Sequence, residues 1–114
     1  MDEPDAPLPP REILTVERER VLAEISGLTI EGPGQMTYGS QAAAATHVFE
    51  QQRDLALRDH ARAHLAAIED ALRRLDAGAF GRCTACGRDI APERLEAVPW
   101  AALCIDCQRA KGRR

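Results

Sequence analysis

The sequence predicts a mainly α-helical protein: an antiparallel two-helix coiled-coil hairpin, followed by a small cysteine-rich lobe that ends in a C-terminal helix. Alanine, leucine, arginine and glutamate dominate, and only 4% of the residues are aromatic. That composition is typical of long helices packed side by side and not of a large globular core. Apolar residues recur at coiled-coil spacing in the middle of the chain, and the last third holds four cysteines in two C-x2-C pairs.

The first helix is predicted from Arg11. Residues 1–10 contain four prolines and three acids, which favours an extended lead-in until Pro10 opens the helix. Four apolar residues then share one stripe, with Arg18 at the remaining seam position: Leu14, Val21, Ile25 and Leu28. Gly32 and Pro33 are expected to stop this helix.

The second helix is predicted to be about twice as long. Three glycines and a proline in residues 32–39 indicate a loop, and Ser40, or Thr46 if the first turn frays, is the expected N-cap. The helix is expected to reach about Ala77 and to stop at Gly78. Its seam has a 4-3-4-3 spacing, and it comprises Ala61, Leu65, Ile68, Leu72 and Leu75. The expected domains are a lead-in at 1–10, a hairpin at 11–77 with a tip loop near 32–45, and a lobe with a basic tail at 78–114.

The two arms differ in length, so part of the second helix needs another partner. About 20 residues span about 30 Å, whereas about 36 span about 54 Å. Three candidates remain open for covering the leucine seam: the lead-in through Leu8, the lobe through its apolar residues, or a second copy of the chain. The last would make a homodimer.

The cysteines are predicted to hold a structural Zn²⁺ ion. Cys83 and Cys86 form one pair, Cys104 and Cys107 form the other, and 17 residues separate the pairs. Each pair aims two thiolates from one turn, and two turns complete a tetrahedral set with no open position. Disulfides, a thioredoxin-like motif and a rubredoxin-like iron site are weaker alternatives, because neither a secretory leader nor a preceding strand is evident.

The lobe is expected to be compact and to depend on its metal. Pro92 should begin a short helix that Pro99 ends, and Cys107 should open a last helix through Lys111. The expected mini-core comprises Phe80, Ile90, Leu95, Val98, Trp100 and Leu103. For Trp100 the prediction is core packing or packing of the lobe against the helices.

Several other residues have less specific interpretations. His47, His60 and His64 are expected to be solvated, although 60 and 64 share a helix face. Met36 and Tyr38 in the loop suit either a contact with a partner or ordinary loop packing. The basic residues after Cys107 are expected to be a solvated tail.

Charge and hydropathy exclude several classes of function. The formal net charge is −3 at pH 7, which does not suit binding to a nucleic-acid backbone. No apolar run approaches the length of a membrane span, so the protein is expected to be cytoplasmic and not to contact a membrane. A closed four-cysteine site and the absence of a spaced nucleophile–base pair predict a protein that is not an enzyme.

Taken together, these motifs resemble the TraR/DksA family of bacterial transcription regulators with a C4-type zinc finger. The resemblance rests on residues 80–87, Ile90, residues 94–97, Pro99 and residues 103–108, preceded by the hairpin. It implies a zinc-dependent regulator that binds RNA polymerase through its secondary channel, pushes its coiled-coil tip toward the active centre and does not bind a specific DNA sequence.

The chain departs from this family at the tip. The family's D-x-x-D-x-A motif falls on Ser40, Ala43 and Ala45, where only the alanine is kept. The aspartates' effector chemistry is therefore not carried over. The alternative hypothesis is an interaction or scaffold protein, with the exposed leucine seam joining two chains and the lobe acting as a cap.

Overall fold

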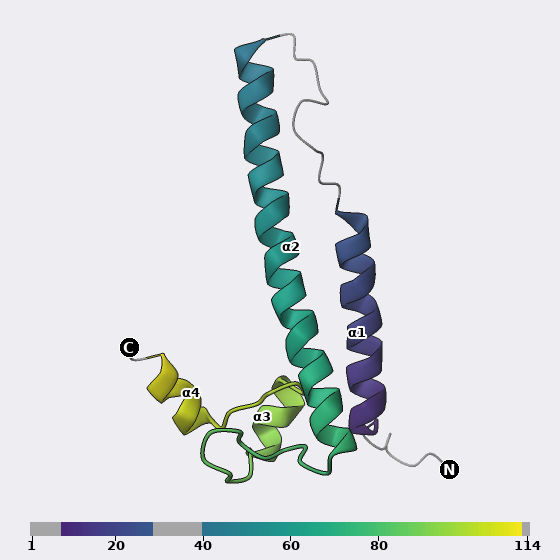
Figure 1. Cartoon of the computed structure of the whole chain (residues 1–114), viewed down its shortest axis with the longest axis vertical. Coiled ribbons are helices and arrows are strands. Elements are labelled where there is room, and N and C mark those ends of the chain that lie inside the picture. Colours follow the sequence, from purple (N-terminus) through teal and green to yellow (C-terminus); the bar gives the residue numbers. More distant parts are fainter. Residues whose placement is uncertain (1–7, 29–39, 113–114) are drawn as a thin grey trace, which may run out of the picture.

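The computed structural model describes residues 8–28 and 40–112, and these residues form four helices. Helix α1 spans Pro10–Gly27, α2 spans Gln41–Asp76, α3 spans Pro92–Ala97 and α4 spans Ile105–Lys111. Helices α1 and α2 lie antiparallel, and the lobe with α3 and α4 sits at the base of α2 (Figure 1). The predicted fold class is confirmed.

Ion pairs fix the register of the hairpin. Arg11 pairs with Asp76 at the base. Seven residues further along α1, Arg18 Nε donates to Glu69 Oε2 at 3.2 Å, seven residues back along α2. This register places Gly27 opposite about residue 60 of α2. The rest of α2 therefore continues beyond the end of α1, as Figure 1 shows.

Helix α1 ends earlier than the sequence suggested. The expected stop, Gly32 and Pro33, lies outside the described residues, and the helix already ends at Gly27, with Leu28 in an extended conformation. Ser26 and Gly27 both have low helix propensity, and the Ser26 hydroxyl donates to the carbonyl oxygen of Ala23. Leu28, predicted on the apolar stripe, is thus the residue that caps the helix.

Helix α2 agrees with the prediction at both ends. The Ser40 hydroxyl accepts a hydrogen bond from the Ala43 N–H at 3.1 Å, so Ser40 is the N-cap. Gly78, just past the other end, has a φ of +76°, which favours glycine. Residues 41–45, which the expected tip loop included, are helical.

The hairpin core is narrow. Leu14, Val21 and Ile68 are fully buried, together with the small residues Ala61 and Ala71. Leu65 and Leu72 of the predicted seam are partly buried against them. Ala71 was not predicted, and its small side chain suits a close approach of two helices.

The lobe supplies the missing cover for the seam. Phe80 packs against the hairpin core and not in the mini-core to which the sequence assigned it. Trp100 also packs against the hairpin core, which is the contact between lobe and helices that was one of its two predicted placements. The mini-core is formed by Ile90, Ala101 and two of the cysteines, with Leu95, Val98 and Leu103 around them. Arg74 Nη2 of α2 donates to the carbonyl oxygen of Ala101 at 3.2 Å, which ties the lobe to the hairpin.

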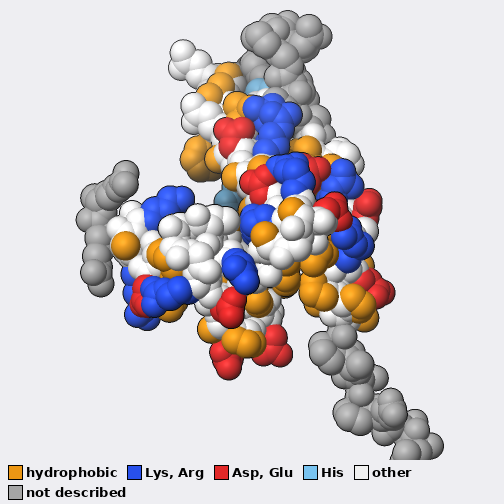
Figure 2. Space-filling model, turned by 60° about the horizontal axis from the view of Figure 1, so that its bottom comes forward, with side chains coloured by type: hydrophobic (Ala, Val, Ile, Leu, Met, Phe, Trp, Pro, Cys, Tyr) orange, Lys and Arg blue, Asp and Glu red, His pale blue; other side chains and the backbone are white. Residues whose placement is uncertain are grey.

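Charged side chains of both signs lie on the surface of the protein. On the face that Figure 2 shows, acidic and basic side chains are interspersed without a large area of one sign. Among the described residues, no helix combines the length and the apolar character that crossing a bilayer requires.

Candidate metal centre

The first cysteine pair lies on a tight loop that glycines make possible. Gly81 and Gly87 have φ values of +84° and +77°, which residues with a Cβ rarely adopt. Between them the Cys83 N–H donates to the Arg88 carbonyl at 2.8 Å, and the Gly87 N–H donates to the Cys83 carbonyl at 2.9 Å. The loop closes on itself, which aims both sulfurs of the pair in one direction.

The second pair lies at the start of α4. Cys104 is the N-cap of this helix, and its sulfur accepts a hydrogen bond from the Cys107 N–H at 3.5 Å. Helix α4 therefore begins at Ile105, two residues before the predicted start at Cys107. Cysteine is not among the usual capping residues, so this role was hard to predict from the sequence.

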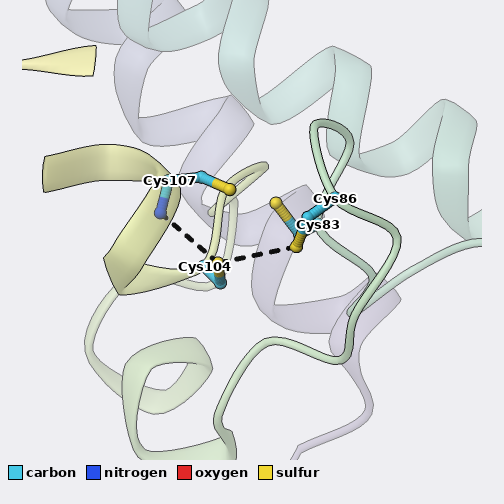
Figure 3. Close-up of side chains that lie close together, drawn as sticks. All are labelled: Cys83, Cys86, Cys104 and Cys107. Atoms are coloured by element: carbon cyan, nitrogen blue, oxygen red, sulfur yellow. Dashed lines mark hydrogen bonds between the residues drawn. The ribbon is translucent and has the colours of Figure 1, made fainter. Parts of the chain in front are cut away.

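The two pairs face each other. The Thr84 N–H donates to the Ala102 carbonyl at 2.8 Å, which joins the loop of the first pair to the segment before the second. The four sulfurs of Cys83, Cys86, Cys104 and Cys107 all lie within 4.8 Å of one another. Figure 3 shows the side chains converging from the loop and from the first turn of α4.

The sulfur geometry fits zinc. Cys86 Sγ and Cys104 Sγ are 3.8 Å apart. Four sulfurs placed tetrahedrally at a Zn–S distance of about 2.3 Å are about 3.8 Å apart, so this edge already has the length that zinc requires. All four cysteines are unpaired by disulfides. The predicted disulfide alternative finds no support in this arrangement.

The electrostatics of the cluster favour a bound cation. Backbone hydrogen bonding, chiefly from Cys104, lowers the pKa of the Cys83 thiol to about 6. The neighbouring sulfurs, Cys104 first, raise the pKa of Cys107 to about 12. Four sulfurs this close cannot all ionise without a compensating positive charge, which a divalent metal supplies.

Arg88 is a site residue that the sequence analysis missed. Its Nε lies 3.4 Å from Cys86 Sγ, and its Nη2 lies 3.7 Å from Asp106 Oδ2. Hydrogen bonding from Arg88 lowers the pKa of Cys86. A guanidinium beside a metal-bound thiolate offsets part of the negative charge of a four-thiolate site. The arginine directly after the C-x2-C-G loop was the available indication.

The other predicted site residues lie elsewhere. Ser40, Ala43 and Ala45 are at the far end of α2, and the latter two are exposed on its first turns. Met36 and Tyr38 lie outside the described residues. The cysteines and the tip thus occupy opposite ends of the molecule.

The histidines only partly follow the prediction. His60 is exposed as expected. His64 is not a solvated residue: its side chain is only 19% exposed, and its ring contacts Trp100.

Comparison with known proteins agrees with this architecture. The prokaryotic dksA/traR C4-type zinc finger matches residues 78–111. The chain is 37% identical over 99 residues to the RNA polymerase-binding transcription factor DksA of Haemophilus influenzae, covering 86% of this chain and 68% of that protein. The Escherichia coli K12 protein of the same name is 44% identical over 55 residues, covering 48% of this chain and 36% of that protein.

A solved structure extends the similarity to the whole fold. The transcription factor DksA2 from Pseudomonas aeruginosa superimposes with a TM-score of 0.74 at 28% identity, covering 92% of this chain and 81% of that one. The cofactor of the lobe is therefore a structural zinc ion. With 37% identity over most of its length and a matching zinc finger, the chain belongs to the DksA/TraR family of C4-type zinc-finger proteins.

Proposed function

We propose that this protein is a zinc-dependent transcription regulator that binds bacterial RNA polymerase through its secondary channel. The observation that carries the proposal is a long hairpin anchored on a zinc lobe, in a chain 37% identical to a relative named as polymerase-binding. Helix α2 has 36 residues, about 54 Å at 1.5 Å per residue, which suits a probe for a narrow channel. This partner would place the protein in the cytoplasm, at promoters without sequence-specific DNA binding of its own.

The proposed ligands of the zinc ion are Cys83, Cys86, Cys104 and Cys107. The metal would hold the two cysteine pairs together and so fix the lobe at the base of α2. The backbone of Thr84 and the side chain of Arg94, whose Nε donates to the Leu103 carbonyl at 2.9 Å, support that lobe from inside. The proposed domain boundaries remain 1–10, 11–77 and 78–114.

The tip of this protein is proposed to affect promoter complexes differently from the tip of family members that carry the two aspartates. Positions 40 and 43 carry no carboxylate, so the chain would bind polymerase through its hairpin body and lobe, with a weak effect on the lifetime of promoter complexes. Met36 and Tyr38 are the proposed apolar contacts at the tip.

A competition experiment tests the function. Purified protein is mixed with bacterial RNA polymerase, with and without a competitor that occupies the secondary channel, and binding is followed by fluorescence anisotropy. Saturable binding that the competitor abolishes is expected. Saturable binding that the competitor leaves unchanged would move the docking site away from the channel, and no binding at high concentration would reject the polymerase proposal.

Sedimentation separates this function from a scaffold role. Phe80 and Trp100 cover the leucine seam within one chain, so a monomer is expected. A stable dimer that the Leu72→Asp substitution converts to a monomer would instead favour the scaffold hypothesis.

A further inference from the structure

His64 lies where α1, α2 and the zinc lobe meet. It belongs to α2, and its Nε2 is 2.8 Å from Oε2 of Glu17 on α1. Its imidazole also meets the indole of Trp100 edge-on, with ring centroids 4.3 Å apart and an interplanar angle of 75°. The His64 side chain on α2 therefore contacts both α1 and the lobe.

Glu17 is a firmly held partner for this imidazole. Arg20 donates to both carboxylate oxygens of Glu17, from Nε and Nη2, each at 2.8 Å, and also reaches Glu24 at 3.4 Å. Arg20 first, and His64 second, lower the pKa of Glu17 to about 2. The carboxylate thus stays ionised and oriented, ready to accept a hydrogen bond from His64.

Packing encloses the His64 ring only in part. A cavity of about 640 Å³ lies beside it, lined by both helices and by Trp100. The α2 residues around this cavity are small or exposed, namely Ala61, Ala63, Ala67 and His60. Because part of the imidazole faces this cavity, its orientation depends on two directed contacts, the hydrogen bond to Glu17 and the edge-on contact with Trp100.

Two directed contacts are needed to set the angle between lobe and hairpin. Arg74 donates to the Ala101 carbonyl, and this bond holds the lobe near α2 at one point, next to the packing of Phe80 on the hairpin core. His64, ten residues and about 15 Å earlier on α2, contacts the neighbouring residue Trp100. Arg74 and His64 thus hold two adjacent lobe residues from two separate points on α2. Together these contacts oppose rotation of the lobe relative to the hairpin.

We propose that His64 is a positioning residue that sets the angle of the zinc lobe on the hairpin. Glu17 orients the His64 ring by its hydrogen bond, and the ring in turn positions Trp100 of the lobe. The inference rests on the proposed function, because docking on polymerase needs the lobe and the tip in a fixed relation. In setting this angle, Glu17 acts through His64, whereas its ion pair with Arg20 stays within α1.

The experiment uses the zinc-loaded full chain and four variants. His64→Phe keeps a ring against Trp100 but cannot bind Glu17, Glu17→Ala removes the carboxylate, and a third variant carries both changes. His60→Gln is the control, because His60 lines the same cavity from an exposed position. Metal content confirms that each lobe is intact.

Two readouts report on the lobe. Residual dipolar couplings of α2 and lobe amides give the angle between them. Hydrogen exchange is followed at the Ala101 amide, which donates to the Val98 carbonyl at 2.9 Å. Trp100 is the chain's one tryptophan, so its fluorescence adds a direct signal from the contact with His64.

Both single variants are expected to change the angle and Trp100 emission, and to accelerate Ala101 exchange about tenfold, the equivalent of one lost hydrogen bond. The double variant is expected to match His64→Phe, since Glu17 then has no ring to align. Additive effects in the double variant would show that Glu17 acts elsewhere. An unchanged angle in His64→Phe, or an equal change in His60→Gln, would overturn the positioning role.

Polymerase binding is measured separately. The two single variants are expected to bind about tenfold more weakly than the parent, and His60→Gln like the parent. If the parent does not bind polymerase, the proposed function fails, yet the angle and exchange data still decide the role of His64. If the parent binds and all variants bind equally, the lobe angle does not matter for docking and the positioning proposal is rejected for that function.

Discussion

At the scale of single residues, the N-cap of α2 offers a direct test of the tip. The Ser40 hydroxyl caps the helix by accepting from the Ala43 N–H. Aspartate caps helices as well as serine does, and a carboxylate near a helix N-terminus is favoured by the helix dipole. Two aspartates can therefore be introduced here without loss of the helix.

We expect Ser40→Asp with Ala43→Asp to give the protein an acidic tip that shortens the lifetime of promoter complexes, while its affinity for polymerase changes by less than about threefold, about 0.7 kcal/mol. Binding and complex decay are measured in parallel. Ser40→Asn with Ala43→Asn is the matched control, because it keeps the cap without the charge. Equal activity of the two variants would contradict an electrostatic role for the tip.

Glu17 predicts the acid dependence of stability. Hydrogen bonds from Arg20 and then His64 lower its pKa to about 2 in the folded chain, so these contacts to the carboxylate stabilise the fold above the unfolded pKa. That contribution is lost as pH falls from about 4.5 toward 2. Because the carboxylate is still 21% exposed, we expect only about 1 to 2 kcal/mol.

Thermal unfolding of the parent and Glu17→Gln at pH 7 and pH 3 measures this effect. The parent is expected to be more stable than the variant at pH 7, and the difference should shrink to about half at pH 3, because the folded carboxylate is still mostly ionised there. Comparing the two chains at each pH cancels the release of zinc by acid, which affects both. A difference that grows on acidification would reverse the sign and refute the assignment.

At the scale of elements, the hairpin depends on a few large side chains. Ile68 is completely buried, at 0% relative exposure, and belongs to the hairpin core against which Phe80 and Trp100 of the lobe pack. Few other large residues share this core, so a cavity here has little around it that can collapse. Replacing Ile68 therefore tests whether the seam is the source of stability.

We expect Ile68→Ala to lower the free energy of unfolding by about 2 to 4 kcal/mol. Leu57→Ala is the control: Leu57 is on the same helix, but 48% of it is exposed, and we expect a change below about 0.5 kcal/mol. Urea unfolding followed by circular dichroism measures both. Similar losses for the two variants would mean that the distal part of α2 is covered as well as the base.

The elements could be predicted from local patterns to different degrees. Helix α2 was predicted at both ends, because Ser40 and Gly78 are standard end residues. The start of α4 was not, because the Cys104 sulfur caps it only when the two cysteine pairs are folded together. Phe80 was assigned to the wrong core, since composition cannot tell which of two adjacent cores a residue joins.

The residues of the site also divide into those that a local pattern predicts and those that depend on the folded structure. Spacing alone indicated the four cysteines, because each C-x2-C pair is a local unit. Arg88 and His64 were missed because their roles depend on neighbours brought close by folding, such as Asp106 and Glu17. Periodicity places a side chain on a helix face but does not say what meets it there.

At the scale of the whole molecule, the lobe and the hairpin have separate sources of stability. The buried residues of the lobe include two cysteines, Cys83 and Cys104. A core built partly from metal ligands cannot survive without the metal. The hairpin core contains no cysteine.

We expect a chelator to remove about one zinc ion per chain and to expose the amides of residues 80–110 to exchange, while most of the helical signal of α1 and α2 remains. Metal analysis, hydrogen exchange and circular dichroism are measured on one sample. Cys86→Ser should mimic the chelator, whereas Ala85→Ser, at the exposed position between the ligands, should retain zinc. Retained lobe protection after metal loss would refute the structural role of zinc.

The continuous α2 helix also has a mechanical consequence. It runs without a break from the lobe to Ser40. A small rotation at the contact between lobe and hairpin therefore becomes a large displacement of the far end of α2 relative to the lobe. Over about 54 Å, a tilt of about 5° at the base moves the far end by about 5 Å, more than the reach of a hydrogen bond. A substitution beside the zinc lobe can thus misplace the tip without touching it, and variants at either end of α2 should be interpreted together.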